Sequence, residues 1–305
     1  MQPKFPEFKP FEFLDRDFIQ EILNNYQPQT SEWTFTNLFI WRNHYQFRWT
    51  TYQDNLIVLC ANKGFYFLQP IGLTSRLELI RFLFKWLNND KAEKEPRIEK
   101  ADQRLVKEIE GAKDLWFEPT RDQFDYVYRT EDLIKLAGRK FHRKKNHVNN
   151  FRKTYPFEYK SLSENNIKEC LELAETWCKL YRCEEDMNLL SEWEAIREAL
   201  ANFSALKIQG GVILVNKKLE AFTFGEFLNK QTAVVHIEKA NPEIKGAYAI
   251  INQQFCEKTW HNVSYINREQ DLGEPGLRQA KLSYNPDHMV EKYRIKWVAT
   301  RRIDK

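Results

Sequence analysis

The segment YINREQDLGEPGLRQAKLSYNP, residues 265–286, carries the most informative pattern in the chain. An apolar run at 263–266 is typical of a strand, and it continues directly into five polar residues: Asn267, Arg268, Glu269, Gln270 and Asp271. Glycine and proline at 273–276 interrupt regular structure, and a short helix is expected between Leu277 and Tyr284. Such a strand would deliver acids, bases and hydrogen-bond donors to one edge of a sheet. A solvated loop followed by a capped helix is the alternative interpretation.

The string NREQDLGxxGLRxAKLSY at 267–284 resembles the signature of stand-alone relatives of the phosphatidylglycerol lysyltransferase C-terminal domain. The resemblance covers most of the chain and is most specific at 236–255 and 265–286. It implies two tandem acetyltransferase-like domains, a fold that also occurs in the aminoacyl-tRNA-dependent enzymes of peptidoglycan bridges.

Length and composition indicate a globular protein with room for two domains. The chain has 305 residues, with 22 Phe, 13 Tyr and 9 Trp, which supply ample core area. The formal charge of +4 is nearly balanced, so only local clustering can point to an anionic partner. Five cysteines without a CxxC pair are expected to be reduced core thiols: Cys60, Cys170, Cys178, Cys183 and Cys256.

No segment is expected to cross a membrane. The first 18 residues contain acids and prolines where a signal peptide needs a basic start and an apolar centre. No run approaches 18 uninterrupted apolar residues. We therefore expect a cytoplasmic protein that would meet any lipid substrate peripherally, at the inner face of the membrane.

The same order of elements is expected twice: two helices, an antiparallel meander, a helix and a strand. In the first half the meander is predicted at 45–68 and in the second at 206–238, from alternating apolar runs separated by turn residues. The predicted fold class is α/β (α+β), with two tandem acetyltransferase-like domains, each a mixed, largely antiparallel sheet flanked by helices. The expected limits are 1–137 and 156–305, joined by a basic connecting helix at 138–155.

The connecting segment GRKFHRKKNHVNNFRKTYP, residues 138–156, is strongly basic and contains no acidic residue. Like charges on one helix repel one another, so an anionic partner would stabilise it, and a phosphate-bearing ligand is the natural candidate. The predicted contacts are Arg139, Lys140, Arg143 and Lys144. The resemblance adds Asn146 and Asn149, which with Arg143 would face inward. A solvated linker helix is the alternative.

The strand VVHIEKA at 234–240 places His236 and Glu238 two residues apart, so both are expected on one face. In acetyltransferase-like folds this strand lines the donor site, and the following turn receives the donor's phosphates. The turn at 241–247 keeps one glycine of the Q/RxxGxG/A pattern that binds CoA, which favours aminoacyl-tRNA as donor. His236 could equally be a packed strand histidine.

Acyl transfer needs a deprotonated acceptor, a stabilised oxyanion and aligned substrates. Glu238, Glu269 and Asp271 are the candidate bases or ammonium-binding groups. Asn267, Arg268 and Lys281 are candidate anion or oxyanion contacts, and His236 and Tyr284 complete the predicted substrate-binding set. An aminoacyl ester is already activated, so neither a metal nor a tightly bound cofactor is expected.

The leading hypothesis is an aminoacyl- or acyltransferase with its active site in the second half and a scaffold in the first. Its donor would be aminoacyl-tRNA or acyl-CoA, and its acceptor phosphatidylglycerol or another amine, hydroxyl or anionic molecule. A CoA-dependent N-acyltransferase of a small amine is one alternative. A non-catalytic protein that binds RNA or an anionic membrane through the basic helix is the other.

Overall fold

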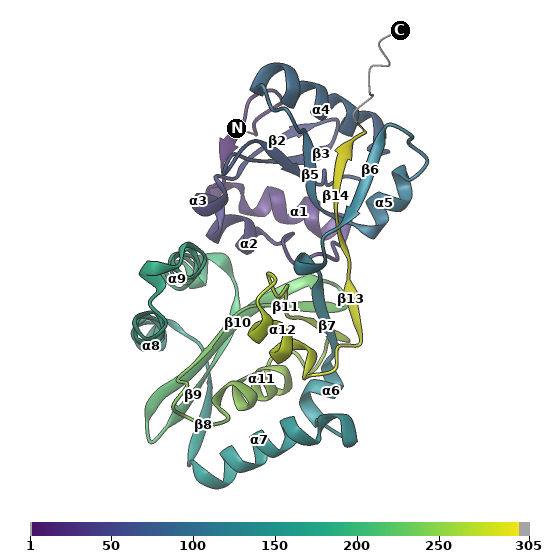
Figure 1. Ribbon diagram of the computed structural model, residues 1–305. Coiled ribbons are helices and arrows are strands. Elements are labelled where there is room, and N and C mark those ends of the chain that lie inside the picture. Colours follow the sequence, from purple (N-terminus) through teal and green to yellow (C-terminus); the bar gives the residue numbers. More distant parts are fainter. Residues whose placement is uncertain (1, 299–305) are drawn as a thin grey trace. The chain divides into compact units, whose positions relative to one another are not determined.

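The computed structural model describes residues 2–298, which form two compact units (Figure 1). The described part of unit 1 comprises residues 2–125 and 290–298, and unit 2 comprises residues 126–289. These limits differ from the expected boundaries at 137/138 and 155/156, and the last segment returns to unit 1. The reason is pairing between distant strands, which local sequence patterns do not reveal.

Unit 1 contains a seven-stranded mixed sheet in the order β1-β2-β3-β4-β5-β14-β6. The predicted meander is confirmed, because β2, β3 and β4 pair antiparallel in sequence. The strands are β1 (Lys9–Pro10), β2 (Arg48–Tyr52), β3 (Asn55–Cys60), β4 (Tyr66–Leu68), β5 (Arg97–Asp102), β6 (Leu115–Pro119) and β14 (Lys292–Trp297). The helices are α1 (Arg16–Tyr26), α2 (Phe35–Ile40), α3 (Arg42–Tyr45), α4 (Leu77–Lys91) and α5 (Gln103–Ile109).

Unit 2 contains a second seven-stranded mixed sheet, in the order β13-β7-β12-β11-β10-β9-β8. Its strands are β7 (Asp125–Arg129), β8 (Phe157–Ser161), β9 (Gln209–Val215), β10 (Lys218–Asn229), β11 (Thr232–Ala240), β12 (Tyr265–Asn267) and β13 (His288–Val290). The helices are α6 (Thr130–Lys135), α7 (His142–Thr154), α8 (Ile167–Leu180), α9 (Met187–Ala201), α10 (Phe203–Leu206), α11 (Ala247–Lys258) and α12 (Pro275–Leu282). The second predicted meander is confirmed over β9, β10 and β11, but it begins at Gln209 and not at residue 206, because residue 206 ends α10 and residues 207–208 connect it to β9.

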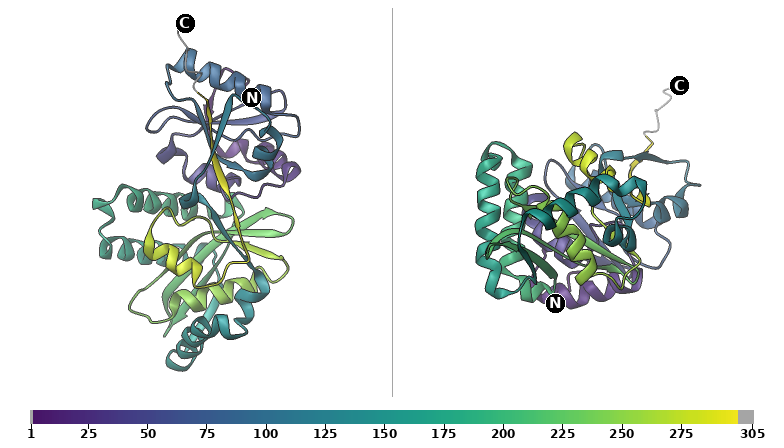
Figure 2. Two further views of the ribbon diagram at one scale, coloured as in Figure 1. Left: turned by 45° about the vertical axis from the view of Figure 1, so that its right-hand side comes forward. Right: turned by 90° about the horizontal axis from the view of Figure 1, so that it is seen from below.

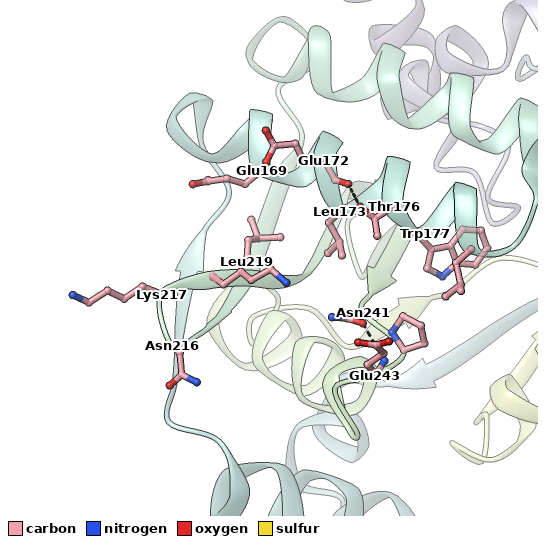
Figure 3. A pocket seen from close by; sticks show the side chains of 13 residues that line it. Glu169, Glu172, Leu173, Thr176, Trp177, Asn216, Lys217, Leu219, Asn241 and Glu243 are labelled. Atoms are coloured by element: carbon pink, nitrogen blue, oxygen red, sulfur yellow. Dashed lines mark hydrogen bonds between the residues drawn. The ribbon is translucent and has the colours of Figure 1, made fainter.

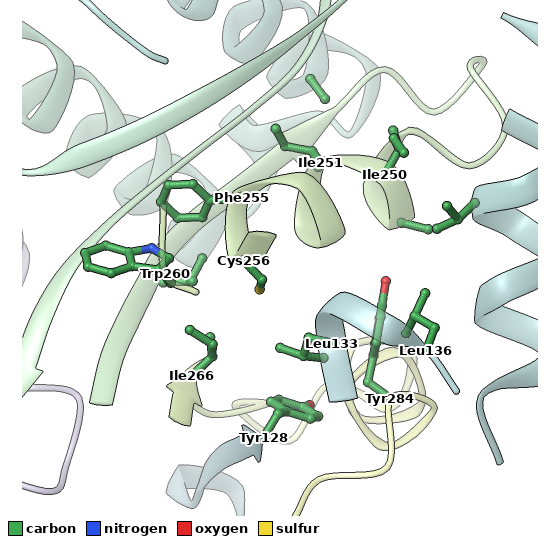
Figure 4. Packing of buried hydrophobic residues seen from close by; sticks show 14 of the residues in the cluster. Tyr128, Leu133, Leu136, Ile250, Ile251, Phe255, Cys256, Trp260, Ile266 and Tyr284 are labelled. Carbon is green, nitrogen blue, oxygen red and sulfur yellow. The ribbon is translucent and has the colours of Figure 1, made fainter. Parts of the chain in front are cut away.

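Helices cover both faces of the unit 2 sheet, with α8 and α9 on one face and α11 and α7 on the other (Figure 2). Side chains of α11 fill the centre of the core, including Ile250, Ile251 and Phe255 (Figure 4). The basic helix α7 is part of this core, since Val148 and Phe151 are buried in it. Their burial contributes roughly 1.5–3 kcal/mol each. The expected free-standing connector is therefore corrected to a packed helix of unit 2.

One inner strand of the unit 1 sheet comes from a distant part of the sequence. In unit 1, β14 lies between β5 and β6 and is antiparallel to both. In unit 2, β7 lies between β12 and β13 and is antiparallel to β12. β14 thus reaches the unit 1 sheet after the whole of unit 2 in the sequence, whereas β7 lies at the start of the continuous segment that forms unit 2. The C-terminal strand therefore belongs to unit 1.

The cysteines divide into two groups. Cys60, Cys170 and Cys256 are free and buried, as expected of core thiols. Cys178 and Cys183 are joined as a disulfide, so the expectation of a reduced thiol was wrong for these two. Their Cα atoms lie 5.1 Å apart across the end of α8, within the range that a disulfide spans. Between residues 2 and 298, no helix has both the length and the apolar character needed to cross a bilayer.

Candidate active site

The predicted polar cluster lies where two parallel strands of unit 2 diverge. β11 pairs with β12 over three positions, from Thr232↔Tyr265 to Val234↔Asn267. Beyond Val234, β11 continues to Ala240 without pairing to β12. The chain leaves β12 at Asn267, and Arg268 follows immediately. Glu238 lies on the part of β11 that β12 no longer covers. Acidic and basic groups from two strands therefore meet at this edge of the sheet, as the sequence predicted.

The centre of the site is a half-buried ion pair between Arg268 and Glu238. Arg268 Nη2 donates to Glu238 Oε1 at 3.0 Å, and Asn252 Nδ2 of α11 donates to Glu238 Oε2 at 3.2 Å. The Arg268 and Glu238 side chains remain 13% and 11% exposed, so the cluster reaches the surface. Burial alone would lower the pKa of Arg268, but Glu238 outweighs it and raises that pKa. Arg268 is therefore a permanent cation here.

Aromatic rings support the same guanidinium. Its central carbon lies 4.8 Å from the ring centre of Tyr284 and 5.9 Å from that of Tyr128. Burial raises the pKa of both phenols, which stay neutral. Tyr284 is thus brought to the site as predicted, and its ring face contributes a cation–π contact.

Lys144 of α7 joins this cluster through the ring of Tyr284. Its Nζ lies 4.0 Å from the Tyr284 ring centre, and the residue is half-buried. Burial, followed by repulsion from Arg268, lowers the pKa of Lys144 to about 8. A lysine in this range can exchange a proton near neutral pH. Lys144 was predicted as a phosphate contact, and its position suits proton transfer as well.

His236 lies in a separate cluster, held between two carboxylates. Its Nδ1 is 3.0 Å from Glu269 Oε1 and its Nε2 is 3.0 Å from Glu226 Oε1. Burial would lower the pKa of His236, but these two hydrogen bonds raise it to about 9. The ring is therefore an imidazolium that donates from both nitrogens and has no lone pair for a base.

The expectation that His236 and Glu238 share a face is corrected by a bulge. The register between β10 and β11 shifts at Phe224/Gly225, where Ile237 and Val235 are paired and His236 is skipped. The alternation of side chains is interrupted at this position. Glu238 consequently contacts Asn252, whereas His236 contacts Glu226.

Asp271 and Lys281 hold the turn that follows β12. Asp271 is fully buried and accepts hydrogen bonds from Tyr126 Oη at 2.6 Å, Gly273 N at 2.9 Å and Arg278 Nε at 2.8 Å. Lys281 Nζ donates to the carbonyl oxygen of Gln270 at 2.6 Å and to that of Arg268. These bonds fit a structural role better than the predicted roles of base and anion contact.

The remaining predicted residues are less central. Asn267 Oδ1 accepts from the amide of Glu269 at 2.8 Å and shapes the turn. On the basic segment, Lys140 pairs with Asp132 at 3.5 Å and Asn146 contacts His142 at 3.4 Å. The following residues are all exposed, so the inward orientation expected for three of them is wrong: Arg139, Lys140, Arg143, Asn146 and Asn149.

Helix α7 also packs on the first turn of α11. Gly246, the N-cap of α11, has φ +90°, and a Cβ there would lie 2.9 Å from the carbonyl oxygen of His147 and 3.2 Å from Cβ of Phe151. A side chain larger than hydrogen would not fit without movement. The turn before α11, where donor phosphates were expected from the sequence, is thus approached closely by α7.

A pocket of about 620 Å³ lies elsewhere in unit 2, between α8 and the turns at 216–219 and 241–243 (Figure 3). Trp177, Leu173 and Glu172 belong to its wall. None of the residues that the sequence predicted for the site lines it. Within residues 2–298, no group of three or more His, Cys, Asp or Glu side chains is arranged to hold a metal ion.

Two site residues were missed by sequence reasoning. Glu226 and Asn252 lie on β10 and α11, outside the predicted polar segments. Glu226 follows the buried run 221–225, and Asn252 interrupts the buried face of α11. A polar residue within an otherwise buried face was the available signal in both cases.

Comparison with known proteins identifies the family. The family model described as "Phosphatidylglycerol lysyltransferase, C-terminal" matches residues 23–296. The chain belongs to this family. Family and fold together indicate an aminoacyl- or acyltransferase.

Similar chains occur among solved structures and curated proteins. A conserved protein of unknown function from Bacteroides thetaiotaomicron is 36% identical with a TM-score of 0.89, covering 95% of this chain and 99% of that one. L-PGS from Bacillus licheniformis is 13% identical with a TM-score of 0.63, covering 95% and 93%, which supports the tandem acetyltransferase-like fold. An uncharacterized protein of Mycoplasmoides gallisepticum is 25% identical over 181 residues. That match spans 56% of this chain and 56% of the curated relative.

Proposed function

We propose that the chain transfers an activated aminoacyl or acyl group to an amine or hydroxyl acceptor at the Arg268–Glu238 cluster, with aminoacyl-tRNA as donor. One observation carries the proposal: a half-buried, permanently charged guanidinium lies beside a lysine whose pKa is about 8. The guanidinium of Arg268 suits stabilisation of a developing oxyanion, and the amine of Lys144 suits proton transfer at neutral pH. In this proposal both groups act in the reaction of one ester carbonyl.

The chemistry needs no further catalytic group. The acceptor's nitrogen or oxygen attacks the ester carbonyl carbon while neutral Lys144 takes its proton. Arg268 Nη1 donates to the carbonyl oxygen as negative charge develops there. The tetrahedral intermediate then collapses, the bond to the ribose oxygen breaks, and Lys144 returns the proton to that leaving oxygen. The new amide or ester and the free tRNA hydroxyl are the products.

The surroundings of α7 favour tRNA over CoA as donor. The backbone of α7 approaches Gly246 so closely that little room is left at the turn where CoA phosphates would bind. The outer side of α7 instead presents exposed cations, including Arg143, Lys145 and Lys153. No acidic residue occurs between 138 and 156. A polyanionic backbone suits this surface, and its binding should depend on salt.

The acceptor in this proposal is phosphatidylglycerol or another anionic molecule, as in the family's description. The protein would then meet the inner face of the membrane peripherally. A cationic surface beside the site would attract such a headgroup.

The test is a binding titration of the purified chain against aminoacyl-tRNA, uncharged tRNA and acetyl-CoA at low and moderate salt. We expect preference for charged tRNA, weaker binding as salt rises, and loss of affinity in an Arg143→Ala, Lys145→Ala variant. A matched Lys94→Ala, Lys113→Ala variant removes two exposed cations of unit 1 and should bind normally. Tight acetyl-CoA binding without tRNA binding would overturn the donor assignment in favour of the CoA-dependent alternative.

Binding and catalysis are then separated by a transfer assay with charged tRNA and phosphatidylglycerol vesicles. Glu238→Gln should abolish aminoacyl release, because it removes the charge that pairs with Arg268. It should leave tRNA affinity unchanged, because α7 is not altered. If neither wild type nor variant consumes the aminoacyl ester, while both bind RNA, the non-catalytic alternative is correct.

A further inference from the structure

The disulfide between Cys178 and Cys183 joins the last turn of α8 to the segment that leads into α9. Only five positions separate the two residues, so the bond constrains the chain locally and not across the whole fold. Cys178 is 9% exposed and Cys183 2%, whereas every residue at 179–182 between them is exposed. The bond therefore lies just beneath the surface of unit 2.

Trp177, the residue before Cys178, connects this end of α8 to the two elements that hold the candidate active site. Its Nε1 donates to Tyr248 Oη at 3.1 Å, and Tyr248 lies in the first turn of α11. Its ring centre lies 3.4 Å from Nζ of Lys239, which follows Glu238 on β11. A side chain of α11 also donates a hydrogen bond to Glu238. A displacement of Trp177 would therefore reach both supports of Glu238.

The disulfide also adjoins the buried end of β11. Nζ of Lys239 donates to Oε2 of Glu192 on α9 at 2.7 Å, and Lys239 is 5% exposed. Both cysteines line the same small gap between α8, α9 and β11 as Trp177, Glu192 and Lys239. The cross-link, the indole and the Lys239–Glu192 pair thus form one contiguous group of contacts.

We propose that Cys178 and Cys183 are a reversible thiol–disulfide switch, which fixes the end of α8 when oxidised and weakens the support of Glu238 when reduced. This inference rests on the proposed function, because it regulates that same site. The proposed function places the chain at the inner face of the membrane. Disulfides in reducing, cytoplasmic surroundings are usually transient and serve catalysis or redox sensing.

The reductant in this proposal is a dithiol, which supplies two electrons. One of its thiolates attacks Sγ of Cys178, the more exposed cysteine, and the S–S bond breaks to release the thiolate of Cys183. The second thiolate of the reductant then attacks the mixed disulfide and releases the thiolate of Cys178. The two cysteines take up the two protons that the reductant lost, and the reductant leaves as its own disulfide.

After reduction, few contacts hold the last turn of α8. Leu180 is 59% exposed and Tyr181 48%, so packing restrains this turn weakly. The final backbone carbonyls of a helix also lack partners within the helix, and helix ends open most easily. Without the cross-link, Trp177 exchanges its bond to Tyr248 for bonds to water. The first turn of α11 and the end of β11 then become more mobile.

The experiment equilibrates the full wild-type chain with reduced or oxidised dithiothreitol. Alkylation in denaturant followed by mass spectrometry should count three free thiols after oxidation and all five after reduction. Hydrogen exchange measured by mass spectrometry should become about tenfold faster on reduction at 177–186 and at 246–249. Single-turnover release of the amino acid from charged tRNA should slow by a similar factor.

Two variants test the assignment. Cys183→Ser should behave like reduced wild type in both buffers, whereas Cys60→Ala, which changes a free buried cysteine of unit 1, should keep the redox response. Five free thiols in the oxidising buffer would overturn the inference, as would equal exchange at 246–249 in both states. Charged tRNA that reacts in neither state would instead refute the proposed function, and the redox-dependent exchange would still be measurable.

Discussion

The hydroxyl of Tyr126 donates to the carboxylate of Asp271 at 2.6 Å, and both residues are fully buried. Burial alone would raise the pKa of Asp271, but the bonds from Arg278 and Tyr126 outweigh it and hold that pKa below its usual range. Stability from these bonds is therefore present above the unfolded pKa near 4 and is lost as the pH falls.

Asp271→Asn should accordingly lower the free energy of unfolding by about 3 kcal/mol at pH 7, because it leaves Arg278 without its charge partner. Urea unfolding at pH 7 and pH 3 measures this, and the gap between variant and wild type should narrow at the lower pH. Glu274→Gln, an exposed change in the same turn, should have little effect. A variant with full stability and no activity would show that Asp271 is catalytic after all.

His236 should make stability depend on pH in the opposite direction. Its pKa rises from an ordinary 6.5 to about 9 on folding. The stabilisation is therefore complete below pH 6.5 and disappears as the pH passes 9, and it amounts to about 3 kcal/mol. The difference in unfolding free energy between wild type and His236→Gln, measured from pH 6 to pH 10, should shrink over this window.

Glu226→Gln removes one of the two carboxylates that hold the imidazolium. The pKa of His236, followed by NMR, should fall in this variant because one hydrogen bond and one negative charge are lost. Glu220→Gln is a control on the same strand, since Glu220 pairs with Lys218. An unchanged His236 pKa in Glu226→Gln would contradict the two-carboxylate arrangement.

Lys144 should determine the pH dependence of transfer. With a pKa of about 8, roughly a tenth of the molecules carry neutral Lys144 at pH 7 and half at pH 8, so kcat/KM should rise through this range. Lys144→Met should remove the rise and lower kcat about a hundredfold. Lys113→Met, which changes an exposed lysine of unit 1, should keep the profile. A profile that Lys144→Met leaves intact would assign the proton transfer to another group.

Arg268→Lys should test the oxyanion role. Lysine keeps the charge but lacks the fork that reaches Glu238 and a carbonyl at once, so kcat should fall about a hundredfold or more while KM changes little. Single-turnover release of the amino acid from charged tRNA measures the chemical step. Arg294→Lys, on β14 of unit 1, is the matched control. If Arg268→Lys instead lowers kcat/KM by raising KM while kcat stays unchanged, Arg268 binds the substrate and does not stabilise the oxyanion.

Much of this arrangement followed from local sequence. The meanders were predictable because alternating apolar residues and turn residues act over a few positions. Arg268 was predictable because it directly follows the apolar run of β12. The pairing of Arg268 with Glu238 was not, since those residues are 30 positions apart and meet only through the parallel pairing of β11 and β12.

The missed features share a physical cause. The bulge at His236 depends on the register between β10 and β11. The residue pattern of β11 alone therefore does not predict it. The role of Asp271 depends on Tyr126, which lies 145 positions away. Arg143, Asn146 and Asn149 were predicted to face inward but are exposed. The rotation of α7 about its axis is set by the packing of Val148 and Phe151 in the core of unit 2. Contacts between residues far apart in the sequence therefore determine which of the predicted residues have a structural role.

The return of β14 to unit 1 has a consequence for synthesis on the ribosome. Unit 1 cannot complete its sheet until β14, at Lys292–Trp297, has been made, whereas every described strand of unit 2 is made earlier. The unit that begins first in the chain is thus the last to be finished. During translation its β5 and β6 must wait with unpaired edges for a partner, and a fragment ending at residue 137 would expose those edges permanently.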